Sequence, residues 1–231
     1  MSILRYINDP AQLMLMIGIR LLIIFTILPI HEYAHALAAR KMGDNTALMH
    51  GRLTLNPLAH VDIFGAIFLM LFGFGWAKPV PVNPRNFKNY KKGVAITAAA
   101  GPLSNLVCAT IGIFILNIIY NIPVASETGY MIIFYIMLAV QFFSSINLSL
   151  AVFNLIPIPP LDGSRILSAV VPYKVNMFMQ KYQQYIYIVF LVLLFTDILQ
   201  MPMSWIIDKI YAGINALFFW VEPLFGLLKI S

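Results

Sequence analysis

The apolar stretch AQLMLMIGIRLLIIFTILPIHEYAHALAAR, residues 11–40, decides the fold class of this chain. It exceeds the roughly 20 apolar residues that a helix needs to cross the hydrocarbon core of a bilayer. The same stretch carries Arg20 and the cluster HEYAH (31–35). Ionisable residues are costly inside a bilayer and usually serve a function there. The sequence therefore predicts a membrane-spanning helix that bears a functional site.

The composition of the whole chain agrees with this prediction. Of the 231 residues, 61% are hydrophobic and only 10% are charged, and the mean hydropathy is +0.85. Soluble globular domains average about 45–50% apolar and about 25% charged residues. Disordered chains need low hydrophobicity and high net charge. Both classes are excluded, and an integral membrane protein remains.

Further apolar stretches extend this pattern along the chain. They predict spanning helices at 94–120, 130–156, 185–199 and 205–228. The stretch 61–76 is short and rich in glycine, so we expect a re-entrant or β-hairpin element there, buried against protein. The expected fold is an all-α membrane protein with about five transmembrane helices and this short element. We expect a single domain over 1–231, with a core at about 15–170 and C-terminal helices at 185–228.

Basic residues predict the orientation of the chain, because loops rich in Lys and Arg stay cytoplasmic. The net charge is +6, and the bases gather in the segments 40–60, 77–93 and 162–184. The connection 121–129 has no base and one acid, Glu127. We therefore expect a multi-pass protein of a prokaryotic plasma membrane, with the N-terminus outside and the C-terminus cytoplasmic. Because the basic residues are explained by membrane orientation, we do not expect nucleic acid as a partner. The sequence does not predict the oligomeric state.

The cluster HEYAH is the sharpest chemical signal in the sequence. Positions i and i+4 share a helix face, so His31 and His35 can bind one Zn²⁺ ion through their imidazoles. Glu32 then lies beside the metal and can act as a general base toward the attacking water. The alternative is a solvated cluster at the membrane surface. The apolar run ALAA (36–39) continues beyond the cluster and disfavours that alternative.

A catalytic zinc usually takes three protein ligands, so a third ligand must come from elsewhere. The single cysteine, Cys108, cannot build a thiolate site. The acidic candidates in or near apolar stretches are Asp162, Asp197, Asp208 and Glu222. His35 precedes Arg40 by five residues, which places it about 7 Å inside the cytoplasmic edge at about 1.5 Å per residue. Asp162 also lies at a cytoplasmic helix end, so the expected active site is between helices near that side.

Five sequence motifs in order resemble those of the site-2 protease family, the intramembrane zinc metalloproteases. They are HEYAH (31–35), GRLTLNPLAHVD (51–62), WAKPVPVNP (76–84), GPLSN (101–105) and FNLIPIPPLDG (153–163). The resemblance covers about residues 15–170. It is to the compact bacterial or archaeal form, without a PDZ or CBS domain.

The resemblance implies a role for each site residue. His31, His35 and Asp162 match the family's metal ligands for one catalytic Zn²⁺, and Glu32 matches its catalytic glutamate. Asn154 matches an asparagine near the metal, whose amide N–H could stabilise the oxyanion formed when water attacks a peptide carbonyl. Substrate-binding residues are not predicted.

The expected function is therefore hydrolysis of a peptide bond in or near the transmembrane helix of a membrane-protein substrate. A metal-binding or metal-transport protein with the same ligands is the alternative, although a transport route usually shows several polar groups at different depths. A pseudo-protease that only binds helices is a third possibility, which the intact Glu32 and Asp162 disfavour.

The sequence also suggests roles for several residues outside the metal ligands and Glu32. Arg20 is expected to extend toward the outer interface. For His60 the resemblance suggests a role near the site or in loop packing, whereas we expect a surface or hydrogen-bonded structural residue. The role of His50 stays open. We expect the side chain of Asn105 either to form a packing hydrogen bond between helices or to contact the site or its substrate. The proline-rich segment 78–84 must be extended, and we expect its edge near Val80 and Val82 to pair with an unwound substrate.

Overall fold

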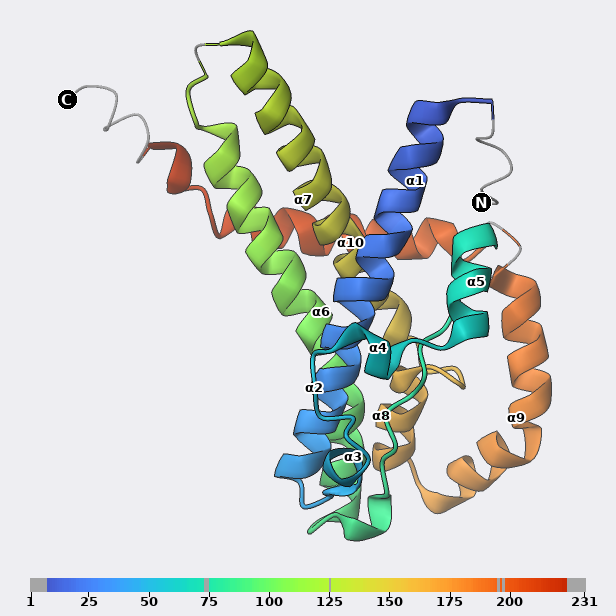
Figure 1. Cartoon of the computed structure of the whole chain (residues 1–231). Coiled ribbons are helices and arrows are strands. Elements are labelled where there is room, and N and C mark those ends of the chain that lie inside the picture. The colour runs from blue at the N-terminus through green and yellow to red at the C-terminus, as the bar shows by residue number, and fades with distance from the viewer. Residues whose placement is uncertain (1–7, 73–74, 125, 195, 197, 224–231) are drawn as a thin grey trace.

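The structure is a computed structural model that describes residues 8–72, 75–124, 126–194, 196 and 198–223. Within these residues the chain is helical, and the only β-type pairing is an isolated antiparallel bridge between Val61 and Ala77. Three long helical segments run alongside one another and form the body of the molecule (Figure 1). The prediction of an all-α protein is confirmed for the described residues.

The first long segment combines α1 (Pro10–Leu22), a π-helical turn (Ile23–Ile27) and α2 (Leu28–Lys41). It begins where the side chain of Asp9 accepts a hydrogen bond from the backbone N–H of Gln12, a typical N-cap. It ends just before Gly43, whose φ of +111° lies in a region that glycine adopts at little cost. The segment Pro10–Lys41 is long and apolar enough to cross a membrane, as the sequence predicts for 11–40.

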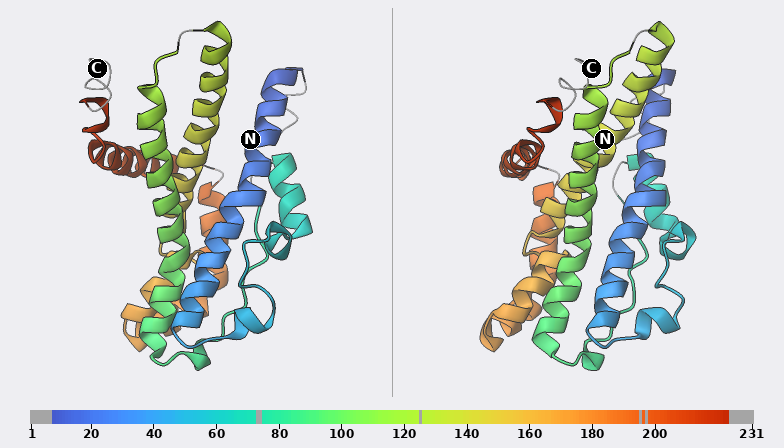
Figure 2. Two further views of the ribbon diagram at one scale, coloured as in Figure 1. Left: turned by 60° about the vertical axis from the view of Figure 1, so that its left-hand side comes forward. Right: turned by 90° about the vertical axis from the view of Figure 1, so that its left-hand side faces the viewer.

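Two further helices, α6 (Tyr90–Tyr120) and α7 (Glu127–Asn154), pack against each other as an antiparallel pair (Figures 1 and 2). Asn89 caps α6 and Ser126 caps α7 through side-chain hydrogen bonds to backbone N–H groups. Both helices are long and apolar enough to cross a membrane. Their positions agree with the spans predicted at 94–120 and 130–156. The chain is therefore a membrane protein with at least three candidate spans.

The glycine-rich stretch forms a short apolar helix followed by an extended return. After α4 (Pro57–His60), helix α5 covers Ile63–Phe72. The backbone N–H of Lys78 donates to the carbonyl of His60 at 2.9 Å, so the return segment lies beside the start of α5. A side chain at Gly65 would collide with the backbone of Trp76. This close approach explains the glycine and brings both ends of the element to one level.

Arg20 stabilises the far end of this element. Its side chain is 5% exposed, and its Nη1 donates a hydrogen bond to the carbonyl of Met70 in the last turn of α5. The last carbonyls of a helix have no partner within the helix, so a basic side chain there satisfies one of them. The expectation that Arg20 extends toward the outer interface is wrong, because burial against α5 gives its charge an acceptor.

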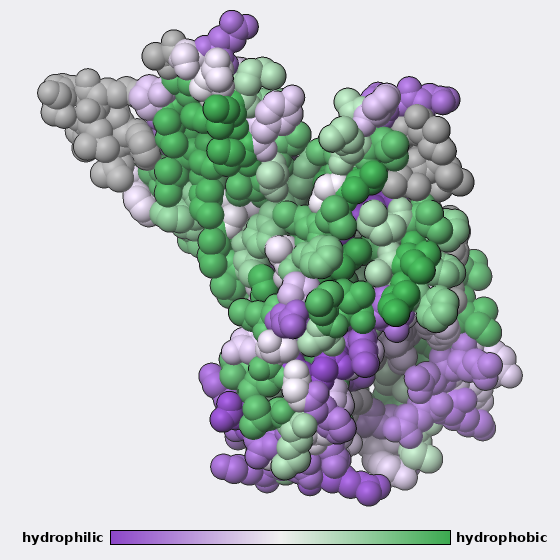
Figure 3. Space-filling model, in the orientation of Figure 1, coloured by the Kyte–Doolittle hydropathy of each residue, from purple (hydrophilic) through white to green (hydrophobic). Residues whose placement is uncertain are grey.

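The polar end of the molecule is organised around Asp44. Figure 3 shows the hydrophilic residues gathered at the end opposite the α6–α7 connection. The Asp44 carboxylate is fully buried and accepts bonds from the backbone N–H of Asn83 and the side-chain amide of Asn86 at 2.7 and 2.8 Å. It also accepts the N–H and hydroxyl of Thr46, the first residue of α3 (Thr46–Met49). Asp44 thus holds the loop after α2 against the short 3₁₀ turn Pro84–Asn86.

The C-terminal part differs from the predicted layout. A short helix, α8 (Asp162–Val170), is followed by α9 (Tyr173–Leu194) and α10 (Gln200–Ala216). Helix α9 begins twelve residues before residue 185, where the sequence predicts its start. The carbonyl of Pro172 accepts hydrogen bonds from the backbone N–H groups of Val175 and Asn176 and so starts the helix there. Helix α10 lies across the long helices (Figures 1 and 2), joined to α6 by a 2.8 Å bond between Asn117 and Asn215. Spans at 185–199 and 205–228 stay predictions, and residues 195, 197 and 224–228 lie outside the described residues.

Candidate metal centre

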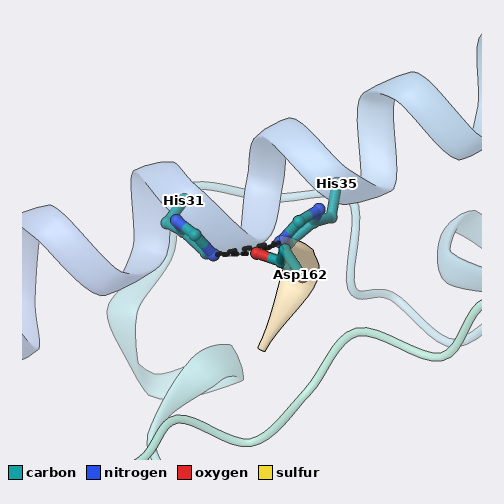
Figure 4. Close-up of side chains that lie close together, drawn as sticks. All are labelled: His31, His35 and Asp162. Carbon is teal, nitrogen blue, oxygen red and sulfur yellow. Dashed lines mark hydrogen bonds and ion pairs between the residues drawn. The ribbon is translucent and has the colours of Figure 1, made fainter. Parts of the chain in front are cut away.

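Three side chains from two distant parts of the sequence converge at one point. His31 and His35 project from one face of α2, and Asp162 is the first residue of α8 (Figure 4). Asp162 Oδ2 lies 3.3 Å from His31 Nε2 and 3.2 Å from His35 Nε2. The two Nε2 atoms are 3.0 Å apart. Each of the three residues is at most 9% exposed. We call this group the candidate metal centre.

The donor set and spacing fit a zinc ion. Zinc prefers imidazole nitrogen and carboxylate oxygen at about 2.0–2.1 Å in a tetrahedral arrangement, and the edge of such a tetrahedron is about 3.3 Å. The three measured separations, 3.0, 3.2 and 3.3 Å, are close to that edge. In the described part of the chain this is the one group of His, Cys, Asp or Glu residues that could hold a metal ion.

A backbone carbonyl orients one of the imidazoles. His35 Nδ1 lies 2.7 Å from the carbonyl oxygen of Thr97 on α6. A carbonyl only accepts hydrogen bonds, so Nδ1 must carry the proton, and Nε2 keeps its lone pair for a metal. The contact also ties α2 to α6 at the level of the centre.

Gly101 on α6 leaves the space in which the two imidazoles meet. A side-chain carbon at this position would collide with the Nε2 atoms of both His31 and His35. The first residue of the motif GPLSN therefore has to be glycine, because the imidazoles occupy the space that a side chain would need. Small residues allow membrane helices to approach closely, and here the approach is between α6 and the imidazoles of α2.

Glu32 is held by the extended segment that follows α5. Its Oε2 accepts a 2.9 Å hydrogen bond from the backbone N–H of Val80. The Val80 side chain packs in a small core with Ala36, one turn along α2, and Ala47 on α3. This packing fixes the extended segment beside the HEYAH helix. The N–H of Val80 is consequently engaged and is not a free edge donor.

Burial and hydrogen bonding act in opposite directions on the Asp162 carboxyl. Burial raises its pKa, but the contacts with His31 and His35 outweigh burial and hold the pKa well below the usual range for aspartate. The carboxyl is therefore an anion, the form that a metal ion or a pair of imidazoles requires.

The sequence singles out further residues besides the three ligands and Glu32. Asn154, in the last turn of α7, donates its amide N–H to the carbonyl of Leu150 at 3.0 Å. Asp208 and Glu222 do not join the group that could hold a metal, and Asp197 lies outside the described residues. His50 is exposed at the end of α3.

His60 is a buried structural residue, as one of the two expectations had it. It is 1% exposed, and its Nε2 lies 2.7 Å from the carbonyl of Thr54. Sequence reasoning missed the carbonyl of Thr97 and the N–H of Val80, because backbone groups are common to all residue types. Gly101 does leave a signal in the sequence, since the run of small residues at 98–101 permits close helix packing.

Comparisons with known proteins agree with this geometry. The model of peptidase family M50 matches residues 19–196, a range that contains the whole candidate metal centre. The candidate zinc metalloprotease YwhC of Bacillus subtilis (strain 168) is 43% identical over 201 residues, which cover 84% of this chain and 86% of that protein. The candidate zinc metalloprotease Rip2 of Mycolicibacterium smegmatis (strain ATCC 700084 / mc(2)155) is 25% identical over 187 residues, 79% of this chain and 67% of its own. No solved structure matches the chain. The chain therefore belongs to peptidase family M50, the site-2 protease family.

Proposed function

We propose that this chain is a zinc-dependent endopeptidase that hydrolyses a peptide bond in or near the transmembrane helix of a membrane-protein substrate. The observation that carries the proposal is the convergence of Asp162 with His31 and His35 at separations of 3.0–3.3 Å. The two histidines lie on a helical segment that is long enough to span a membrane. Membership of family M50 and the names of the two relatives support the same activity.

Each residue of the site has a role in this proposal. His31, His35 and Asp162 hold the ion, which when bound supplies Lewis acidity and makes water easier to deprotonate near neutral pH. Glu32 accepts the proton of the attacking water at Oε1 or Oε2 and later donates it to the leaving amine. The Val80 N–H orients the Glu32 carboxylate. Asn154 donates its amide N–H to the developing oxyanion, after exchanging its present bond to Leu150.

The proposal includes an orientation in the bilayer. The long helices cross the membrane, the N-terminus lies outside, and the candidate metal centre lies near the cytoplasmic side. Helix α5 is re-entrant, which the bridge between Val61 and Ala77 and the bond from Lys78 to His60 support. A cytoplasmic C-terminus requires that α9 and α10 either both cross the bilayer or both stay on its inner side.

The proline-rich segment is proposed to receive the substrate. A peptide must be unwound before its bonds are accessible, and pairing with an extended segment replaces the lost backbone bonds. Because Glu32 occupies the N–H of Val80, pairing must use other groups of the segment. Charged or proline substitutions at Val82 should lower cleavage while the zinc content stays normal.

Metal transport is the weaker candidate. A transport route needs polar groups at successive depths. In the described residues the groups able to hold an ion form one cluster at one level.

The decisive experiment compares the wild type with Glu32→Gln and Asp162→Ala, purified in full length. We expect Glu32→Gln to keep zinc, measured by elemental analysis, and to lose cleavage of single-span model peptides by a factor on the order of 10²–10⁴. Asp162→Ala should lose both zinc and cleavage. Zinc uptake into vesicles by Glu32→Gln at the wild-type rate, with no cleavage by the wild type, would favour transport instead.

A further inference from the structure

Three neighbouring cavities, which we together call the trough, lie along α8 and α9 near the polar end of the molecule. Its first part, about 380 Å³, lies between the extended segment at Val80, helix α6 and helix α8. The next part, about 270 Å³, lies between α8 and α9 and shares Arg165 and Ser168 with the first. The last part, about 550 Å³, shares Gln180 and Gln183 with the second. The shared residues show that the three parts are neighbours.

Each wall of the first part belongs to a segment that contacts or contains a residue of the candidate catalytic site. Val80 binds Glu32 through its N–H, and Thr97 binds His35 through its carbonyl. The α8 wall, which contributes Arg165, begins with Asp162. A chain lying in this part would therefore contact residues that hold Glu32 and His35 in place.

The charged residues that line the trough are all basic. Its lining includes two bases, Arg165 and Lys181, and no acid. The Arg165 side chain is exposed and, within the described residues, makes no ion pair. A cleft of one sign attracts ligands of the opposite charge.

We infer that Arg165 selects substrates that carry an aspartate or glutamate a few residues from the scissile bond, an inference that rests on the proposed peptidase function. Arg165 follows Asp162 by one helical turn, a rise of about 4.5 Å. An extended peptide advances about 3.3 Å per residue. A carboxylate one to three residues from the scissile bond is thus within reach of the guanidinium, which matches a carboxylate with two parallel hydrogen bonds.

A membrane phosphate is the competing anion, since Arg165 lies at the polar end. The position of Arg165 favours the peptide, because the residue lines a cleft whose other walls include Val80 and Thr97, the residues that hydrogen-bond Glu32 and His35. The uncharged amides of Asn176, Gln180 and Gln183 continue the lining. Amide side chains pair with peptide groups through both donors and acceptors.

The test uses full-length protein in phosphatidylcholine vesicles, with and without phosphatidylglycerol. The substrates are synthetic single-span peptides that differ in one residue, Asp, Asn or Lys, moved stepwise across the boundary between the apolar and polar parts. The readout is the ratio of kcat/KM for the Asp and Asn peptides, which cancels any general change in activity. Arg85→Gln is the matched control, because Arg85 is exposed and lies outside the trough.

For the wild type and Arg85→Gln we expect Asp to be favoured over Asn by about five- to tenfold at one or two positions. Arg165→Gln should bring the ratio to about one, and Arg165→Glu should favour Lys at the same positions. Cleavage that depends on Glu32 but shows equal rates for Asp and Asn peptides would overturn this inference alone. So would an Arg165→Gln effect seen only with phosphatidylglycerol, which would assign Arg165 to lipid. Absence of Glu32-dependent cleavage would overturn the proposed function itself.

Discussion

Helix α6 carries two buried polar regions that differ in how their polar groups are satisfied. At the candidate metal centre, the carbonyl of Thr97 meets His35, and the imidazoles meet Asp162. One turn beyond Gly101, Asn105 is fully buried, and neither its amide nitrogen nor its amide oxygen has a partner in the described residues. The oxygen of Asn147 on α7 is also without one.

In the described residues, the ligand groups of the candidate metal centre have hydrogen-bond or ion-pair partners, whereas the amide of Asn105 has none. An unsatisfied buried amide costs free energy, whereas the groups of the centre compensate one another. The packing hydrogen bond that the sequence suggested for Asn105 is absent among the described residues. A contact of Asn105 with the site or its substrate stays a prediction. The substitutions below test how strongly each region depends on its present contacts.

Gly101→Ala should give the largest effect, because it fills the space where the imidazoles meet. We expect zinc content and cleavage to fall by about 100-fold, as when groups that support metal ligands are disturbed. Elemental analysis and peptide cleavage measure both. Gly18→Ala is the matched control in another spanning helix, since a side chain at Gly18 meets nothing within 4 Å. Normal zinc content in Gly101→Ala would show that α6 can move away from the centre.

Asp44→Asn extends the comparison to a third buried polar group, one that is well satisfied and lies outside the spans. Burial raises the Asp44 pKa, but hydrogen bonds from Thr46, Asn86 and the backbone of Asn83 outweigh it and lower the pKa in the folded state. The unfolded chain therefore binds the proton more tightly, and this stabilisation is present above about pH 4 and lost as the pH falls further.

We expect Asp44→Asn to cost about 2 kcal/mol at pH 7, seen as a lower Tm. The Tm difference from the wild type should shrink as the pH falls below about 4. A difference that is independent of pH would mean that the carboxylate charge contributes nothing beyond shape.

Asn105→Leu should give the smallest effect on stability. Removing an unpaired buried amide loses no hydrogen bond, so Tm should stay the same or rise. Asn117→Leu in the same helix is the control, because Asn117 bonds Asn215 at 2.8 Å, and its loss should cost about 1 kcal/mol. A drop of Tm in Asn105→Leu as large as in the control would show that an internal water satisfies the amide. Lower cleavage at unchanged Tm would place Asn105 on the substrate path.

Much of the fold could be predicted because hydrophobicity alone requires spanning helices. The three long apolar segments were predicted within a few residues of their observed bounds. The C-terminal part was harder, because its helices carry polar residues such as Asp208 and Lys209 among apolar ones. Helix α10 takes its direction from contacts with α6, including the 2.8 Å hydrogen bond between Asn117 and Asn215, and no local pattern encodes such contacts.

The sequence by itself determined the membrane environment and the pairing of His31 with His35, because apolar length and the i, i+4 spacing are local properties of a helix. Its family motifs also pointed to Asp162 before any geometry was known. Only the tertiary structure decided which backbone groups orient the site and that Gly101 must lack a side chain. It also decided that Arg20 donates a hydrogen bond to the last turn of α5. These features join segments that are dozens of residues apart, and their contacts exist only after the helices have packed.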